Sequence, residues 1–219
     1  MPDCGSSADS GAGNEIRRNA FGVRRGEQRR VTPDQVSAAV LAGGFSSRMG
    51  RDKALLEING QTLLEIQVSR LKRLGISDIL LSGTGSRIPG ARNVGDVYPH
   101  RGPLSGIHAC MLEAAFPALL VVSVDVPLIP DEALRQLIDE HEGGITALQH
   151  GERTEPLMAV YDCCLAGEAE RILKSEKTAV FRLMEASSPR LCPYQGDERL
   201  LAGCNTPEEY LRILKDQEN

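Results

Sequence analysis

Residues 36–53 read VSAAVLAGGFSSRMGRDK, and this stretch decides the expected fold. Its first six residues, Val36–Leu41, form a mostly apolar run that stops abruptly at Ala42, Gly43 and Gly44. A short apolar run that ends in glycines is typical of a buried strand entering a loop. We therefore expect a buried strand followed by a glycine-rich, basic loop.

The same kind of pattern continues downstream. Short apolar runs predict further strands at 78–82, 118–124, 145–149 and 157–161. Apolar residues at helical spacing predict helices at 62–74, 104–116, 130–141, 165–174, 178–185 and 207–215. Continuously apolar strands that alternate with helices indicate an α/β domain, with a mostly parallel sheet covered on both faces.

The first 35 residues differ from the rest of the chain. They begin with small polar residues, and 16–30 contain six arginines without apolar periodicity. We expect a flexible N-terminal extension at 1–35 and one domain at 36–216; a basic arm that touches an acidic partner is the alternative interpretation.

Composition excludes several classes of protein. A net charge of −5 argues against a general nucleic-acid binder. The sequence contains no run of 18 apolar residues, so no membrane span is predicted. The N-terminus also lacks the apolar region of a secretory signal. The six cysteines form no C-x-x-C pair, so we expect reduced thiols in a cytoplasmic protein. His108, His141 and His150 are interpreted as surface residues.

The loop after the first strand has the chemistry of a phosphate site. Consecutive glycines let main-chain N–H groups approach an anion, while Arg48 and Lys53 add positive charge. Neither a Walker motif nor a dinucleotide fingerprint follows this strand. A surface turn with scattered charges is the alternative interpretation of the separate pieces.

Two aspartates, Asp125 and Asp96, are further candidate site residues. Asp125 ends the most apolar run, where a carboxylate is well placed to bind Mg²⁺ together with substrate phosphates. Asp96 precedes a loop in which 102–106 (GPLSG) opens a helix. Capping of a turn by Asp125, and an ordinary surface position for Asp96, are the alternatives.

The order of these motifs resembles the molybdenum cofactor guanylyltransferases. The resemblance rests on LAGGFSSRMGRDK (41–53), VGD (94–96), RGPLSGI (101–107), VVSVDVPLI (121–129) and CNTPEE (204–209), and it spans about 38–214. It implies a Rossmann-like, three-layer nucleotidyltransferase fold. Related nucleotidyltransferases often carry AAG, so the AGG string favours the guanylyl branch.

The resemblance also implies a role for each matching position. Leu41, Ala42 and Gly43 would contact the guanosine of GTP, with Gly44 near the phosphates. Lys53 would bind the triphosphate, Arg48 would neutralise phosphate charge, and Asp125 would bind Mg²⁺. The remaining implied contacts are Asp96 on the nucleotide, and Pro156 and Asn205 on the molybdopterin side. Ser82 stands where the family often has a nucleotide-binding Asn, which reduces the support for guanine selectivity.

The expected reaction is transfer of GMP from GTP to the terminal phosphate of molybdopterin, with Mg²⁺ as cofactor. An attacking phosphate is already ionised, so alignment and charge neutralisation suffice. Other expectations are transient contact with molybdenum-insertion proteins and molybdoenzymes, and no nucleic-acid or membrane partner. The alternatives are cytidylyl transfer, sugar-nucleotide synthesis, or a non-catalytic nucleotide-binding module.

Overall fold

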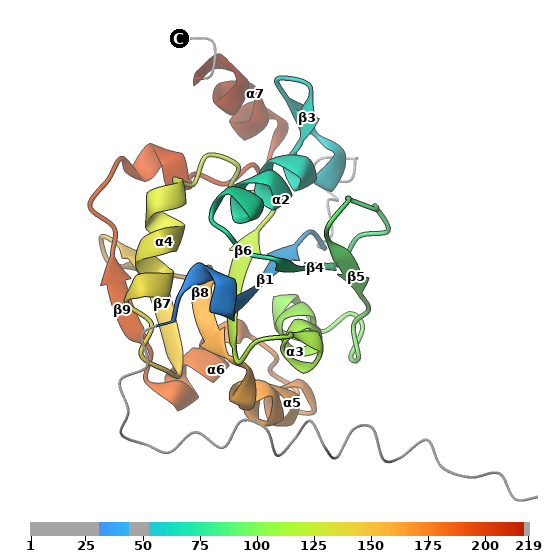
Figure 1. The fold of residues 1–219 in the computed structure, drawn as a ribbon, viewed down its shortest axis with the longest axis vertical. Coiled ribbons are helices and arrows are strands. Elements are labelled where there is room, and N and C mark those ends of the chain that lie inside the picture. The colour runs from blue at the N-terminus through green and yellow to red at the C-terminus, as the bar shows by residue number, and fades with distance from the viewer. Residues whose placement is uncertain (1–30, 44–52, 217–219) are drawn as a thin grey trace, which may run out of the picture.

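A seven-stranded sheet forms the centre of the computed structural model, which describes residues 31–43 and 53–216 (Figure 1). The strand order is β5-β4-β1-β6-β8-β7-β9. Among these strands β8 alone runs opposite to the others, because it pairs antiparallel with both β6 and β7. The bounds are β1 Val36–Leu41, β4 Asp78–Ser82, β5 Arg92–Val94, β6 Ala118–Ser123, β7 Ile145–His150, β8 Arg153–Asp162 and β9 Arg190–Pro193.

Helices cover both faces of this sheet. Alternation along β1 sends Val36, Ala38 and Val40 to one face and Ala39 and Leu41 to the other. The first face packs against α2, α4 and α7, and the second against α3, α5 and α6 (Figure 1). Their bounds are α2 Leu63–Arg73, α3 Pro103–Glu113, α4 Asp131–Asp139, α5 Ala166–Leu173, α6 Val180–Ser187 and α7 Pro207–Asp216. The predicted three-layer α/β fold is confirmed.

Local sequence explains where α2 begins. The Thr62 hydroxyl accepts a hydrogen bond from the Glu65 N–H at 3.2 Å, and the Glu65 carboxylate accepts one from the Thr62 N–H at 2.8 Å. This reciprocal cap satisfies two main-chain donors that a helix start leaves free. At the other end Gly75 has a φ of +92°, which glycine adopts without steric cost.

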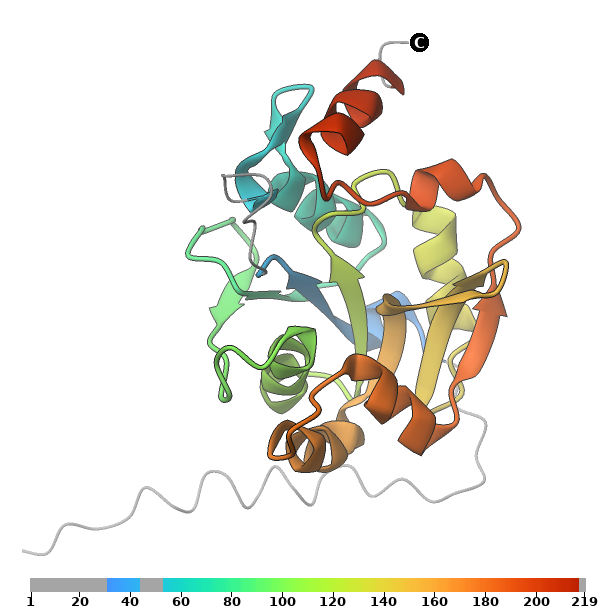
Figure 2. The same cartoon turned by 180° about the vertical axis from the view of Figure 1, so that it is seen from behind.

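Several short elements were not predicted. They are the edge strands β5 and β9, the hairpin of β2 (Glu57–Ile58) and β3 (Gln61–Thr62), and the short 3₁₀ helices η1 Pro33–Gln35, η2 Lys53–Leu55, η3 Cys163–Leu165 and η4 Glu198–Leu201. Figure 2 shows the hairpin beside α7, where the Tyr210 hydroxyl donates to the Glu57 carbonyl at 2.5 Å. Edge strands expose polar residues, so they lack the apolar run that marks a central strand.

Two histidines that were interpreted as surface residues are buried. His141 is 1% exposed and its ring nitrogens lie 3.1 Å from the Thr146 hydroxyl and from the Asp162 carboxylate. His108 is 2% exposed and packs beside the ring of Tyr98. These two polar partners make burial of the His141 ring possible, and the pairing with Asp162 on β8 is not revealed by a local sequence pattern.

The packed chain reaches back to Val31, which is buried against the α2 side of the core. None of the helices in 31–43 and 53–216 has the length and apolar character to cross a membrane.

Candidate active site at the carboxyl edge of the sheet

Four neighbouring strands bring their loops to one edge of the sheet. Leu41 at the end of β1 lies opposite both Ser82 at the end of β4 and Ser123 at the end of β6. Because β8 runs the other way, its first residues arrive at this same edge. Ligands of open α/β sheets bind outside the carboxyl ends of the strands, so this edge is the candidate site.

Two glycines bring the loops after β1 and β4 into main-chain contact. The Ala42 N–H donates to the Ser82 carbonyl at 2.9 Å, which carries the strand pairing into the loops. A Cβ placed on Gly43 would lie 2.9 Å from Gly83 Cα, and a Cβ on Gly83 would lie 2.3 Å from Gly43 Cα. Only glycine at both positions allows this approach, so Gly43 has a packing role independent of any ligand.

Ser82 and Asp96 form a pair beside this contact. The Ser82 hydroxyl donates to the Asp96 carboxylate at 3.3 Å, and Ser82 is only 4% exposed. A Cβ on Gly106 of α3 would lie 2.4 Å from the Ser82 oxygen, so the hydroxyl points into the protein against α3. Asp96 itself is exposed. Ser82 is therefore placed to orient Asp96, which in turn offers its carboxylate to solvent or to a ligand.

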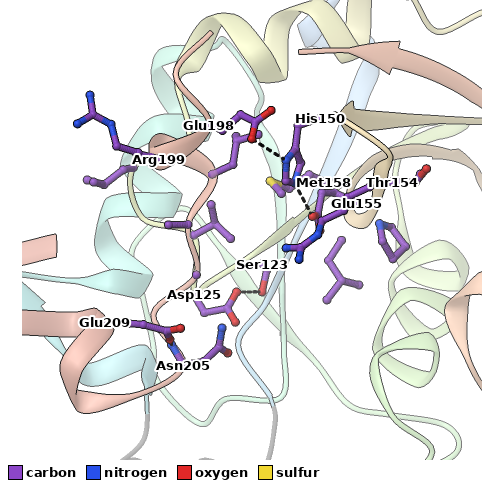
Figure 3. A pocket seen from close by; sticks show the side chains of 18 of the residues that line it. Ser123, Asp125, His150, Thr154, Glu155, Met158, Glu198, Arg199, Asn205 and Glu209 are labelled. Atoms are coloured by element: carbon purple, nitrogen blue, oxygen red, sulfur yellow. Dashed lines mark hydrogen bonds and ion pairs between the residues drawn. The ribbon is translucent and has the colours of Figure 1, made fainter. Parts of the chain in front are cut away.

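Lys53, Asp125 and Asn205 come together from three distant parts of the chain. The Lys53 ammonium donates to the Asn205 side-chain oxygen at 2.7 Å and lies 3.8 Å from the Asp125 carboxylate. The other carboxylate oxygen of Asp125 accepts a hydrogen bond from the Ser123 hydroxyl (Figure 3). One cation, one anion and one amide thus converge at the end of β6.

Main-chain contacts hold Asn205 in this place. The Cys204 N–H donates to the Asp125 carbonyl at 2.7 Å, and the Asn205 N–H donates to the Glu209 carboxylate at 2.7 Å. Burial raises the pKa of the Cys204 thiol to about 11, so this group is a protonated packing residue at neutral pH. The segment before α7 is therefore tied to the end of β6 at Cys204 and to the first turn of α7 at Asn205.

A cavity of about 1050 Å³ opens beside this cluster. The end of β6, the β7–β8 hairpin, η4, the start of α7 and Phe181 of α6 surround it. Figure 3 shows two groups of labelled side chains on different sides of this cavity: Asp125, Asn205 and Glu209, and His150, Glu155 and Glu198. Its volume suits a ligand of the size of a nucleotide or a similar cofactor.

The residues predicted for the site fall into two groups along the edge. Lys53, Asp125 and Asn205 meet as described, and Pro156 lines the same cavity. The second group consists of Leu41, Ala42, Gly43, Ser82 and Asp96, around the ends of β1 and β4. Arg48 and Gly44 lie outside the described residues.

Asp125 is the residue that could hold a metal ion. Its side chain is 24% exposed and lies at the cavity. In the described chain no three His, Cys, Asp or Glu side chains gather into a metal-binding group. A single carboxylate fits Mg²⁺, because this ion keeps water and substrate phosphates as its other ligands.

One group of cavity residues was missed. His150, interpreted as a surface residue, has a side chain that is only 14% exposed, and its Nε2 lies 2.9 Å from the Glu155 carboxylate. Its Nδ1 lies 3.8 Å from the Glu198 carboxylate. No sequence motif marks these three residues, since the β7–β8 hairpin and η4 bring them together.

The fold and this site define a nucleotidyltransferase, and comparisons with known proteins agree. The family model of the MobA-like NTP transferase domain matches residues 38–189. The chain therefore belongs to the MobA-like NTP transferase family, on the branch of the molybdenum cofactor guanylyltransferases.

Individual relatives agree with this assignment. A probable molybdenum cofactor guanylyltransferase of Pelotomaculum thermopropionicum is 34% identical, over 84% of this chain and 95% of that protein. The molybdenum cofactor guanylyltransferase of Xanthomonas euvesicatoria is 31% identical, over 82% and 95%. Molybdopterin-guanine dinucleotide biosynthesis protein A from Archaeoglobus fulgidus shares the fold, with a TM-score of 0.71 and 22% identity over 83% of this chain and 98% of that chain.

Proposed function

We propose that this chain transfers GMP from GTP to the terminal phosphate of molybdopterin, which forms molybdopterin guanine dinucleotide and releases diphosphate. The observation that carries the proposal is the convergence of Lys53, Asp125 and Asn205 at a cavity next to the loops of β1 and β4. Relatives named guanylyltransferase support it, because this chain matches them over almost their whole length.

The nucleoside belongs at the ends of β1 and β4. Leu41 and Ala42 are buried, so their contacts with a ligand would come from the main chain. The exposed Asp96 carboxylate, which Ser82 orients, can accept hydrogen bonds from a ligand. Guanine offers two adjacent N–H donors on its Watson–Crick edge, whereas cytosine offers one amino group beside an acceptor. This difference favours GTP if Asp96 faces the base.

The triphosphate belongs between this end and the cavity. Lys53 supplies a positive charge there, and Arg48 and Gly44 are proposed from the sequence to add a second charge and main-chain donors. A phosphate oxygen of molybdopterin attacks the α-phosphorus of GTP, and the bond to the diphosphate leaving group breaks. The attacking oxygen is ionised at neutral pH, so no side chain has to remove a proton. Lys53 offsets the repulsion between the two anions.

Asp125 is the proposed ligand of Mg²⁺. A bound magnesium ion would neutralise phosphate charge and help to orient the reacting groups. Its donor set fits this use, because one partly exposed carboxylate beside a cavity leaves the other positions to phosphates and water. The Ser123 hydroxyl fixes the orientation of that carboxylate.

Molybdopterin belongs in the cavity lined by Pro156 and Asn205. Asn205 is shared between this cavity and Lys53, so it connects the two substrates. We also propose a cytoplasmic location and transient contact with molybdenum-insertion proteins and molybdoenzymes, since the product of this function must be passed to acceptor proteins.

The test is turnover of the purified chain with molybdopterin, Mg²⁺ and each of GTP, CTP, ATP and UTP, followed by diphosphate release. We expect GTP to exceed the others at least tenfold in kcat/KM. Lys53→Ala should abolish most of this turnover, whereas Lys177→Ala, on an exposed loop, removes the same charge and should leave it unchanged. A preference for CTP would replace the proposal by cytidylyl transfer, and no turnover with any nucleotide would refute it.

A further inference from the structure

The cavity has an end whose chemistry does not suit a phosphate. Glu155 of β8 and Glu198 of η4 stand on either side of His150 there, as Figure 3 shows. The carboxylates of Glu152, Glu155 and Glu198 outnumber the exposed cation Arg153 at this end, which disfavours a phosphate anion there. The phosphate of a second substrate therefore belongs near Lys53, and the part of the substrate that reaches Glu155 must instead donate hydrogen bonds.

The hydrogen bonds of His150 leave one carboxylate ready for such a donor. His150 Nε2 donates to Glu155 Oε1 at 2.9 Å, because a carboxylate can only accept. The Glu155 side chain is still 31% exposed at the cavity, so part of its capacity to accept hydrogen bonds remains for a ligand. His150 is thus a positioning residue, which fixes Glu155 without occupying its free side.

An aromatic ring lines the same cavity. Phe181 of α6 is 52% exposed, so its ring is accessible to a ligand in the cavity. A flat heterocycle stacked on Phe181 would cover it, as aromatic side chains cover nucleic-acid bases. Ring and carboxylate together fit a planar heterocycle with N–H donors on its edge.

We propose that Glu155, positioned by His150, and Phe181 recognise the 2-amino-4-oxopyrimidine ring of a pterin. The 2-amino group and the adjacent N3–H are parallel donors, and one carboxylate accepts both. This inference rests on the proposed function, since it names the part of the second substrate that enters the cavity. It orients that substrate with its pterin at Glu155 and its phosphate at Lys53.

Equilibrium dialysis of the full chain with 6-hydroxymethylpterin tests the inference without phosphate, GTP or turnover. Because this ligand carries no phosphate, it cannot bind through a phosphate contact with Arg153, an exposed cation that also lines the cavity. The chemical control is 6-hydroxymethyllumazine, which has a 2-oxo acceptor in place of the 2-amino donor and should repel Glu155. We expect the wild type to bind the pterin at least tenfold more tightly than the lumazine.

Two variants separate recognition from loss of charge. Glu155→Gln should weaken pterin binding at least tenfold and remove most of the preference over lumazine. Glu152→Gln removes the same charge from an exposed turn at the same cavity and should leave both affinities unchanged. Phe181→Leu should weaken both ligands together, because stacking does not distinguish them.

The inference is overturned if Glu155→Gln keeps the preference of the wild type, or if the wild type binds neither ligand. GTP binding, titrated on the same samples, distinguishes the two levels of failure. A chain that binds GTP but no pterin retains the proposed nucleotide site and loses only the pterin subsite. A chain that binds pterin but not GTP loses the proposed function instead.

Discussion

Replacement of Gly83 by alanine tests whether the loops of β1 and β4 must touch for the site to form. Gly83 has a φ of +76°, and alanine in this left-handed region costs about 1–2 kcal/mol. The added Cβ would lie 2.3 Å from Gly43 Cα and 2.4 Å from Gly43 N, more than about 1 Å inside an ordinary contact. Overpacking of this kind costs about 1–3 kcal/mol, so the total expected loss is about 2–5 kcal/mol.

Urea unfolding followed by circular dichroism measures this loss. We expect the midpoint of Gly83→Ala to fall by about 1–2 M, from an m-value of about 2–3 kcal/mol/M. The matched control is Gly85→Ala in the same loop, where a Cβ meets nothing within 4 Å and φ is not positive. That variant should change the free energy of unfolding by less than about 1 kcal/mol. Equal midpoints for the two variants would refute the reasoning, and a weaker affinity for GTP in Gly83→Ala alone would link the contact to the nucleoside end.

Three further perturbations test other parts of the structure. Asn205→Ala removes the acceptor of Lys53 at 2.7 Å and should lower kcat about tenfold, with little change in the melting temperature; unchanged kinetics would contradict the contact's role. Asp125→Asn should raise the Mg²⁺ concentration for half-maximal diphosphate release at least tenfold, and an identical Mg²⁺ dependence would remove Asp125 from the metal site. Burial opposes ionisation of Asp78, but hydrogen bonds from the Ser37 hydroxyl and a main-chain N–H outweigh it and lower its pKa. Because the pKa is lowered in the folded state, ionised Asp78 stabilises the fold fully above the unfolded value of about 3.9, and this stabilisation is lost as pH falls through the folded value. Asp78→Asn should therefore cost about 1–3 kcal/mol at pH 7 in urea unfolding, and progressively less as the pH falls below about 3.9.

The central strands could be predicted because burial leaves a direct mark on sequence. β1 and β4 have the predicted bounds, since both of their faces are covered and every residue but Asp78 at the start of β4 is buried. β5 and β9 were missed because they lie at the two edges of the sheet, where only one residue of each strand is buried. Their pairing comes from the neighbouring strand, and local sequence does not encode it.

The site could be predicted where it follows from the ends of strands. Asp125 was found because the most apolar run ends beside it, and Asn205 through the resemblance of CNTPEE. The hydrogen bond from Lys53 to Asn205 spans 152 residues, and no local pattern predicts it. His150 was missed for a related reason, because its burial depends on Glu155 across a hairpin and on Glu198 from another segment.

The AGG string has a different meaning once the structure is known. From the sequence, its first glycine, Gly43, favoured GTP over other nucleotides. In the structure Gly43 contacts the backbone of Gly83, a constraint that holds whichever base is bound. We therefore propose that base selection rests on side chains at this end, namely on the exposed Asp96 carboxylate that accepts a hydrogen bond from the Ser82 hydroxyl. On this proposal Ser82 acts through Asp96, so Ser82→Ala should reduce the preference for GTP over CTP, and Asp96→Asn should reduce it further.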